Sequence, residues 1–157
     1  MKIKKILAPT DLSKESMAGV RAAIEMAKKS DAEVTVYHVV CLDEFMRFEL
    51  TRVRPLMLDR LLEKYRAELG ALLESDLADL RPLPSVTTMI ELGVPDKNIV
   101  EKAQRDSVDL IVMSTHGRTG LAHVLTGSVT EAVVRRAPCA VLSIHPEPAK
   151  AAAAAAA

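Results

Sequence analysis

The 157-residue chain has no tryptophan and few other aromatic side chains, which together make up 3% of the sequence. Proteins that hold single-stranded nucleic acid stack the bases on such rings, so no stacking platform is expected. An excess of positive charge is also absent, because 21 Lys+Arg balance 21 Asp+Glu. A protein that neutralises the phosphates of a nucleic acid is usually basic. We therefore expect no nucleic-acid partner.

Long hydrophobic runs and sets of cysteines are missing as well. No apolar run approaches the roughly 20 residues that a membrane span requires, and the apolar stretch that follows Met1 is too short for a secretory signal peptide. Cys41 and Cys139 are the only cysteines, so there is no disulfide framework. We expect a cytoplasmic protein with reduced thiols and no membrane association. Its apolar fraction of 49% is ordinary for a chain that buries a core and excludes disorder of the main body.

The last residues of the chain differ in composition from the rest. Seven consecutive alanines occupy positions 151–157. We expect residues 148–157 to be an artificial tail and residues 1–147 to form a single domain, because this length suits one core.

The hydrophobic pattern alternates between short apolar runs and stripes with helical spacing. It predicts strands at 3–9, 33–40, 86–92, 108–114 and 139–144, and helices at 13–29, 56–80, 96–105 and 128–136. Apolar strands separated by helices are typical of a parallel sheet that is buried on both faces. Right-handed crossovers then favour an open, doubly wound α/β fold of the Rossmann-like kind, with strand order 3-2-1-4-5 and helices on both faces.

This strand order predicts where a ligand would bind. The winding direction reverses between the first and fourth strands, and ligands of such sheets bind beyond the carboxyl ends of the strands at that point. The residues expected there are Pro9, Thr10 and Asp11, together with the loop at 114–128. The same order separates the two cysteines, so a disulfide between them is not expected.

The loop after the fourth strand has features of an anion site. Gly127 and Ser128 open a helix, whose N–H groups and dipole favour a phosphate. Gly117 permits positive φ angles, and Arg118 could contribute a charge-assisted contact. An alternative remains open, because Ser128 and Glu131 also have the spacing of a capping box that needs no ligand. Neither GxxxxGK[ST] nor GxGxxG is present.

The stretch STHGRTGLAHVLTGSVTEAVVRRAPCAVLSI resembles the universal stress protein family. Gly117, nine further residues and Gly127-Ser128 match the last two elements of G-x2-G-x9-G-[ST], the pattern of the members that bind ATP. Ser114 stands in the place of the first glycine. The segments KKILAPTDLSKES and GVPDKNIVEKAQRDSVDLIVMSTHG are similar to the family as well. The resemblance covers residues 2–146 and is weakest at 41–84.

The resemblance implies an adenine nucleotide alpha hydrolase-like fold with the same strand order, and ATP or AMP at the point of reversal. Asp11 would accept a hydrogen bond from a ribose hydroxyl, and backbone groups of Val39 or Val40 would meet the adenine edge. The loop and the final helix would hold the phosphates and any bridging Mg²⁺, with no metal site made by side chains alone. The full set of candidate ligand residues is Pro9, Thr10, Asp11, Val39, Val40, Met113, Ser114, His116, Gly117, Arg118, Gly127, Ser128, Val129 and Thr130.

These observations favour a nucleotide-binding regulatory or stress-response protein over an enzyme. Apart from Asp11, the sequence offers no clear general base or Mg²⁺ carboxylate, so catalysis would amount at most to slow ATP hydrolysis. A dimeric scaffold without a ligand is the other alternative. An apolar strand at the edge of a sheet invites pairing with its twin about a two-fold axis, so we expect a homodimer through residues 139–145, as is common in the family.

Overall fold

A five-stranded parallel sheet forms the centre of the molecule, with strand order β3-β2-β1-β4-β5. The computed structural model describes residues 2–41, 55–115 and 128–146, with only the backbone for 55–57. The strands are β1 (Lys5–Pro9), β2 (Glu33–Cys41), β3 (Val86–Gly93), β4 (Leu110–Ser114) and β5 (Ala140–Ile144). The helices are α1 (Lys14–Ser30), α3 (Pro55–Asp76), α4 (Pro95–Arg105) and α5 (Ser128–Arg136), with a short 3-10 helix, η1 (Ala78–Leu80). The predicted fold class and strand order are confirmed.

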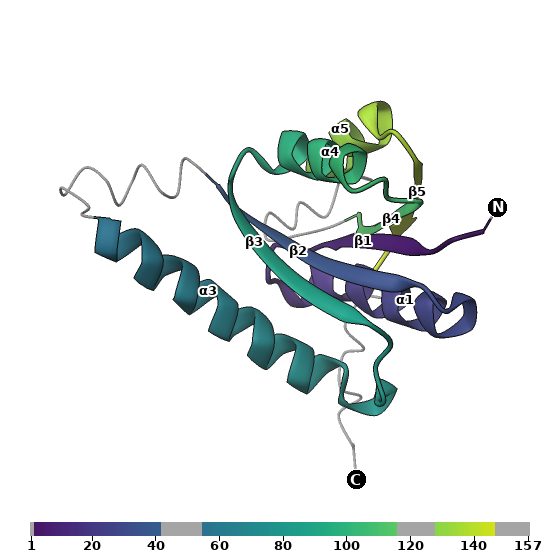
Figure 1. Ribbon diagram of the computed structural model, residues 1–157, viewed down its shortest axis with the longest axis horizontal. Helices are drawn as coiled ribbons and strands as arrows, with labels where there is room; N and C mark the ends of the chain where they lie inside the picture. Colours follow the sequence, from purple (N-terminus) through teal and green to yellow (C-terminus); the bar gives the residue numbers. More distant parts are fainter. Residues whose placement is uncertain (1, 42–54, 116–127, 147–157) are drawn as a thin grey trace, which may run out of the picture.

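Two layers of helices cover the sheet, α1 and α3 on one face and α4 and α5 on the other (Figure 1). Alternation along the strands produces these two cores, because successive side chains point to opposite faces. In β1, Ile6 and Ala8 belong to the core under α1 and α3, whereas Leu7 belongs to the core under α4 and α5. In β4, Val112 and Met113 divide in the same way. Each inner strand is therefore buried on both sides, as its solid apolar run predicts.

The boundaries of several elements differ from the predicted ones by a few residues. The largest difference is in α3, which ends at Asp76, whereas the apolar stripe predicted a helix to residue 80. The stripe persists because η1 follows directly and Leu80 packs at the margin of the same core. An apolar stripe reports which residues are buried, and it does not distinguish an α-helix from the 3-10 turn that follows it.

The two cysteines are far apart in the sheet order and are both free thiols. Cys41 is the last residue of β2, and Cys139 directly precedes β5. Two strands, β1 and β4, lie between β2 and β5. The expectation that these cysteines form no disulfide is confirmed.

Candidate functional site

The carboxyl ends of the central strands do not finish level with one another. The pairing of β1 with β2 ends at Pro9↔Tyr37, although β2 continues to Cys41. On the other side, the pairing of β1 with β4 ends at Leu7↔Ile111. Pro9 has no N–H group with which to extend the ladder towards β4. A gap in the ladders therefore opens at the middle of the sheet, where the winding reverses.

Backbone direction distinguishes the two valines of β2 that the sequence proposes for this site. Along β2, the N–H of Glu33 bonds to Lys4 on the β1 side and that of Val34 bonds to Ser85 on the β3 side. The N–H and C=O of one residue in a parallel strand point to the same side, and successive residues alternate. Val39 therefore presents its polar backbone groups on the β1 side, beyond the last residue of β1. Those of Val40 belong to the ladder with β3.

The turn that follows β1 is held by its own side chains. The hydroxyl oxygen of Thr10 accepts a hydrogen bond from the N–H of Leu12 at 3.0 Å. Oδ1 of Asp11 accepts from the N–H of Ser13 at 3.0 Å and from its hydroxyl at 2.5 Å. Leu12, between these contacts, has a φ of 66°, which a leucine rarely adopts. These bonds hold the turn in a conformation that its sequence alone does not favour.

Ser13 is the N-cap of α1. Its hydroxyl accepts a hydrogen bond from the N–H of Ser16 at 3.1 Å, which satisfies one of the free donors of the helix. Asp11 acts one step earlier, because its carboxylate orients this capping serine. Sequence reasoning identified the acidic turn and missed the capping role of Ser13, although a serine directly before a helical stripe is a recognisable N-cap signal.

The first turn of α5 is connected to the end of β4. The hydroxyl of Thr130 donates a hydrogen bond to the carbonyl oxygen of Ser114 at 2.9 Å, and both residues are buried. Ser128, at the start of the helix, is exposed, and Val129 is half-buried. The first N–H groups of a helix have no partner within it, so this turn offers donors next to β4. Glu131 forms its ion pair with Arg135, one turn further along.

α1 approaches the end of β4 closely at Gly19. A Cβ atom added to this glycine would lie 2.7 Å from the backbone nitrogen of Ser114 and 2.9 Å from Cα of Met113. Only a residue without a side chain allows this contact. The packing of α1 thus fixes the position of the two residues that end β4. Strand alternation places the side chain of Ser114 on this α1 face, where the residue is 6% exposed.

The structure brings all of the described candidate residues to this one end of the sheet. They are Pro9, Thr10, Asp11, Val39, Val40, Met113, Ser114, Ser128, Val129 and Thr130. His116, Gly117, Arg118 and Gly127 lie outside the described residues, so the structure does not test the predicted glycine loop. Within the described part of the chain, no group of three or more His, Cys, Asp or Glu residues could hold a metal ion.

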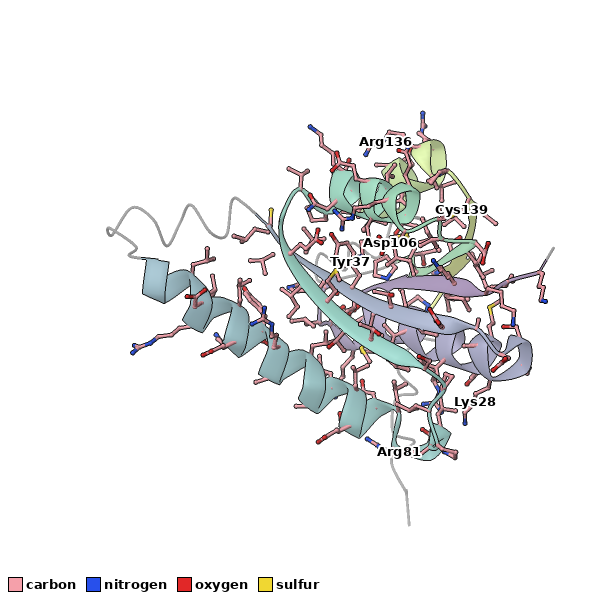
Figure 2. All side chains as sticks on the ribbon, viewed as in Figure 1. Lys28, Tyr37, Arg81, Asp106, Arg136 and Cys139 are labelled. Atoms are coloured by element: carbon pink, nitrogen blue, oxygen red, sulfur yellow. The ribbon has the colours of Figure 1, made fainter. Side chains whose placement is uncertain are left out.

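A polar cluster on the α4 face escaped the sequence analysis. The hydroxyl of Tyr37 donates to Glu91 at 2.7 Å, and Arg105 donates to the same carboxylate at 2.9 Å. Figure 2 shows Tyr37 on the sheet below α4. Burial and the hydrogen bond to Glu91 raise the pKa of Tyr37 far above its ordinary value. Burial acts to raise the pKa of Glu91, but the bonds from Tyr37 and Arg105 outweigh it, so that this pKa lies below its ordinary value.

A separate cavity lies at the opposite end of the sheet, near the amino ends of the strands. Its volume is about 600 Å³, and its charged lining residues are Lys4, Lys5, Lys28, Asp31 and Glu33. Figure 2 shows Lys28 near this end. Ala27, Ala32 and residues 82–85, before β3, complete the lining. This cavity is distinct from the candidate site, which lies at the other end of the sheet.

No helix in the described ranges is both long and apolar enough to cross a membrane.

Comparison with known protein families and sequences finds a consistent set of relatives. The model of the universal stress protein family matches residues 2–145. Universal stress protein MJ0531 of Methanocaldococcus jannaschii is 38% identical over 141 residues, which cover 90% of this chain and 81% of that protein. A putative universal stress protein of Staphylococcus haemolyticus is 31% identical over 147 residues, covering 92% of this chain and 86% of the relative.

Comparison with solved structures gives the same picture of the fold. Hypothetical protein MJ0577 superposes with a TM-score of 0.78 at 28% identity, over 94% of this chain and 99% of that one. A universal stress protein in complex with cAMP has a TM-score of 0.65 at 24% identity, over 93% and 99%. One from Archaeoglobus fulgidus in complex with dAMP has a TM-score of 0.58 at 18% identity, over 92% and 99%.

Proposed function

This chain belongs to the universal stress protein family, and we propose that it binds an adenine nucleotide, ATP or AMP, at the carboxyl ends of β1 and β4. The observation that carries the proposal is the gap in the ladders at the winding reversal. There Pro9 ends one ladder, Val39 presents backbone groups beyond β1, and the first turn of α5 is bonded to Ser114. The base would use the backbone of Val39, the ribose the turn after Pro9, and the phosphates the first turn of α5.

The base and the ribose would use the β1–β2 side. The N–H and C=O of Val39 offer a donor beside an acceptor, which suits the edge of a purine. Asp11 lies on the turn directly after β1, half-buried and close to this strand end. A carboxylate accepts hydrogen bonds from hydroxyl groups, and it would do so here for the ribose. The pre-organised turn reduces the cost of ordering Asp11 when the ligand binds.

The phosphates would use the α5 side. The first turn of α5 contributes N–H donors and the positive end of a helix dipole, and Ser128 is exposed there. A divalent cation such as Mg²⁺ would be held mainly by the phosphate oxygens. Gly117, Arg118, Gly127 and His116 remain proposed contributors from the segment between β4 and α5.

Similarity to the complexes with cAMP and dAMP makes adenine nucleotides the first ligands to test. Those two ligands belong to proteins that are 24% and 18% identical to this chain. The physiological role that we propose is regulatory: nucleotide binding sets the state of a cytoplasmic homodimer that takes part in a stress response. Both cysteines are free thiols, which agrees with a reducing compartment.

The proposed dimer would form through β5. This strand lies at one edge of the sheet, and Leu142 is 37% exposed on it. An exposed apolar edge strand pairs readily with another chain, and two copies of β5 would pair antiparallel about a two-fold axis.

The deciding experiment is a search for bound nucleotide followed by titration. Mass spectrometry of the denatured, freshly purified protein would detect a nucleotide that co-purifies. Calorimetry with ATP, ADP, AMP and GTP, each with Mg²⁺, should give binding for adenine nucleotides. Asp11→Ala should weaken ATP binding about tenfold or more, the loss expected of one charge-assisted hydrogen bond. Asp31→Asn, at an exposed helix end, is the matched control and should bind as the parent does.

The other outcomes identify the alternatives. Steady release of phosphate from ATP that disappears with Asp11→Ala would indicate a slow hydrolase. A dimer without heat from any adenine nucleotide would indicate a scaffold and would refute the proposed function.

A further inference from the structure

A buried histidine contacts the turn of the proposed site from the neighbouring strand. His38, on β2, is 4% exposed, and its Nδ1 lies 2.8 Å from the backbone oxygen of Thr10. A carbonyl oxygen can only accept, so Nδ1 carries the hydrogen and donates it. The hydrogen bond therefore fixes the tautomer of His38.

The bonded carbonyl is the one that precedes Asp11. It belongs to the peptide plane between Thr10 and Asp11, so a bond to this oxygen fixes the rotation of that plane. The N–H of Thr10 is held by Tyr37 at 2.9 Å, and its hydroxyl lies 2.7 Å from that of Ser16. His38 thus adds a contact at the carbonyl oxygen of Thr10, directly before the residue that carries the proposed ribose-binding carboxylate.

His38 is itself held from the other side by the long helix. The ring of Tyr65, on α3, lies 5.1 Å from the ring of His38 at an interplanar angle of 46°. Aromatic rings at this separation attract each other. Tyr65, His38 and Thr10 therefore form a continuous path of contacts from α3 to the turn after β1.

The strain in the turn explains why it requires such a support. Leu12 is held in a left-handed conformation, which costs a leucine free energy and persists only where its surroundings enforce it. If the carbonyl of Thr10 lost its donor, the remaining bonds of the turn would hold the Thr10–Asp11 peptide less firmly. The carboxylate of Asp11 would then point away from the strand end in part of the molecules.

We infer that His38 is a positioning residue of the nucleotide site: its Nδ1–H orients the Thr10–Asp11 peptide, and thereby the Asp11 carboxylate, without contact with the ligand. This inference rests on the proposed function and adds to it a residue outside the ligand contacts. It also makes α3, through Tyr65, part of the support of the site.

Two variants of His38 distinguish the effect of losing the N–H donor from the effect of losing the ring. His38→Asn keeps an N–H donor close to the position of Nδ1, whereas His38→Leu keeps an apolar side chain without a donor. With ATP and Mg²⁺ in calorimetry, the dissociation constant of His38→Leu should rise about tenfold, and that of His38→Asn should stay within about threefold of the parent value. Equal affinity of His38→Leu and the parent would overturn the inference.

A control has to show that a loss of stability alone does not weaken the binding of ATP. Leu77→Ala is the control, because Leu77 is fully buried just after the end of α3 and is not part of the path from Tyr65 through His38 to Thr10. It should lower the midpoint of thermal unfolding and leave the affinity for ATP unchanged. If His38→Leu and Leu77→Ala bind ATP equally weakly, the role of His38 is merely structural and the inference is wrong.

A ligand-free measurement keeps the inference testable if the proposed function fails. Hydrogen exchange of the Leu12 and Ser13 amides, followed by NMR in the protein without nucleotide, should accelerate about tenfold in His38→Leu relative to the core amide of Val112. It should not do so in His38→Asn. If the parent binds no adenine nucleotide, the proposed function is wrong while this result still stands. Unchanged exchange would reject the positioning role by itself.

Discussion

The hydroxyl of Thr130 donates a hydrogen bond of 2.9 Å to the carbonyl oxygen of Ser114. This bond connects the first turn of α5 to the last residue of β4, and both partners are buried. It determines where the first N–H groups of α5 lie relative to the end of the sheet. The position of any phosphate bound at this helix start depends on it.

Thr130→Val should therefore weaken both folding and nucleotide binding. Valine has the same shape and no hydroxyl, so the carbonyl of Ser114 would lose this donor at a cost of about 1–2 kcal/mol in the free energy of unfolding. Urea denaturation measures this loss, and calorimetry with ATP should show weaker binding. Thr130→Ser restores the donor and should recover most of both. If serine fails to rescue binding, the hydroxyl is not what positions α5.

Two glycines provide a matched test of how α1 packs against β4. Gly19→Ala places a methyl group 2.7 Å from the backbone of Ser114, and overpacking of this kind costs about 1–3 kcal/mol. Gly70→Ala, in the middle of α3, meets nothing within 4 Å and should stabilise the protein by about 0.5–1 kcal/mol. Chemical denaturation should thus give opposite signs. Equal effects would mean that the close approach at Gly19 does not exist in solution.

The Tyr37–Glu91–Arg105 cluster predicts a pH dependence of stability. The folded pKa of Glu91 lies below its ordinary value of 4.5, so its stabilising contribution is fully present above that pH. It is lost as the pH falls through the lower, folded value. The difference in free energy of unfolding between the parent and Glu91→Gln should accordingly be largest near neutral pH and shrink below about pH 4.5. Urea titrations from pH 3 to pH 7 measure it.

Tyr37→Phe tests the cause of this shift. It removes one of the two donors to Glu91 and leaves the ring in place, so NMR titration should show a higher pKa for Glu91. A pKa that moves down, or not at all, would contradict the assignment.

A lysine on β5 tests the proposed dimer. Leu142 is exposed on this strand, and a charge on an edge strand opposes pairing with a second copy. Leu142→Lys should reduce the mass measured by light scattering to that of one subunit at micromolar concentration. Val134→Lys, on the exposed face of α5, is the control and should leave the mass unchanged. A parent protein that is already monomeric would exclude the dimer.

The order of the elements could be predicted from the sequence because burial on both faces leaves a direct signature. Strands such as β4 are buried at every position and apolar at all but the last, and a helix follows each inner strand, so parallel pairing is the consistent arrangement. The location of the candidate site at Pro9–Asp11 follows from the same topology, because the reversal of winding is a property of strand order.

The sequence could not predict the contacts that hold the turn after β1 or the start of α5. Ser13, His38 and Thr130 act through individual hydrogen bonds whose partners lie on other elements or depend on the unusual φ of Leu12. Periodicity reports which face is buried and carries no information about a bond between a ring nitrogen and one carbonyl. A choice between Val39 and Val40 likewise needed the alternation of backbone direction, which depends on the register with β1.

The early end of β1 has a consequence for what can enter the middle of the sheet. At an outer edge such as β5, a whole strand has room to add to the ladder. Beside Val39 it does not, because the turn that carries Asp11 begins where β1 stops. A group that continues the hydrogen bonding there has to offer a donor next to an acceptor to the backbone of Val39. A strand of another chain can therefore be added at an edge of the sheet, whereas at its centre only a small molecule could continue the ladder of β2.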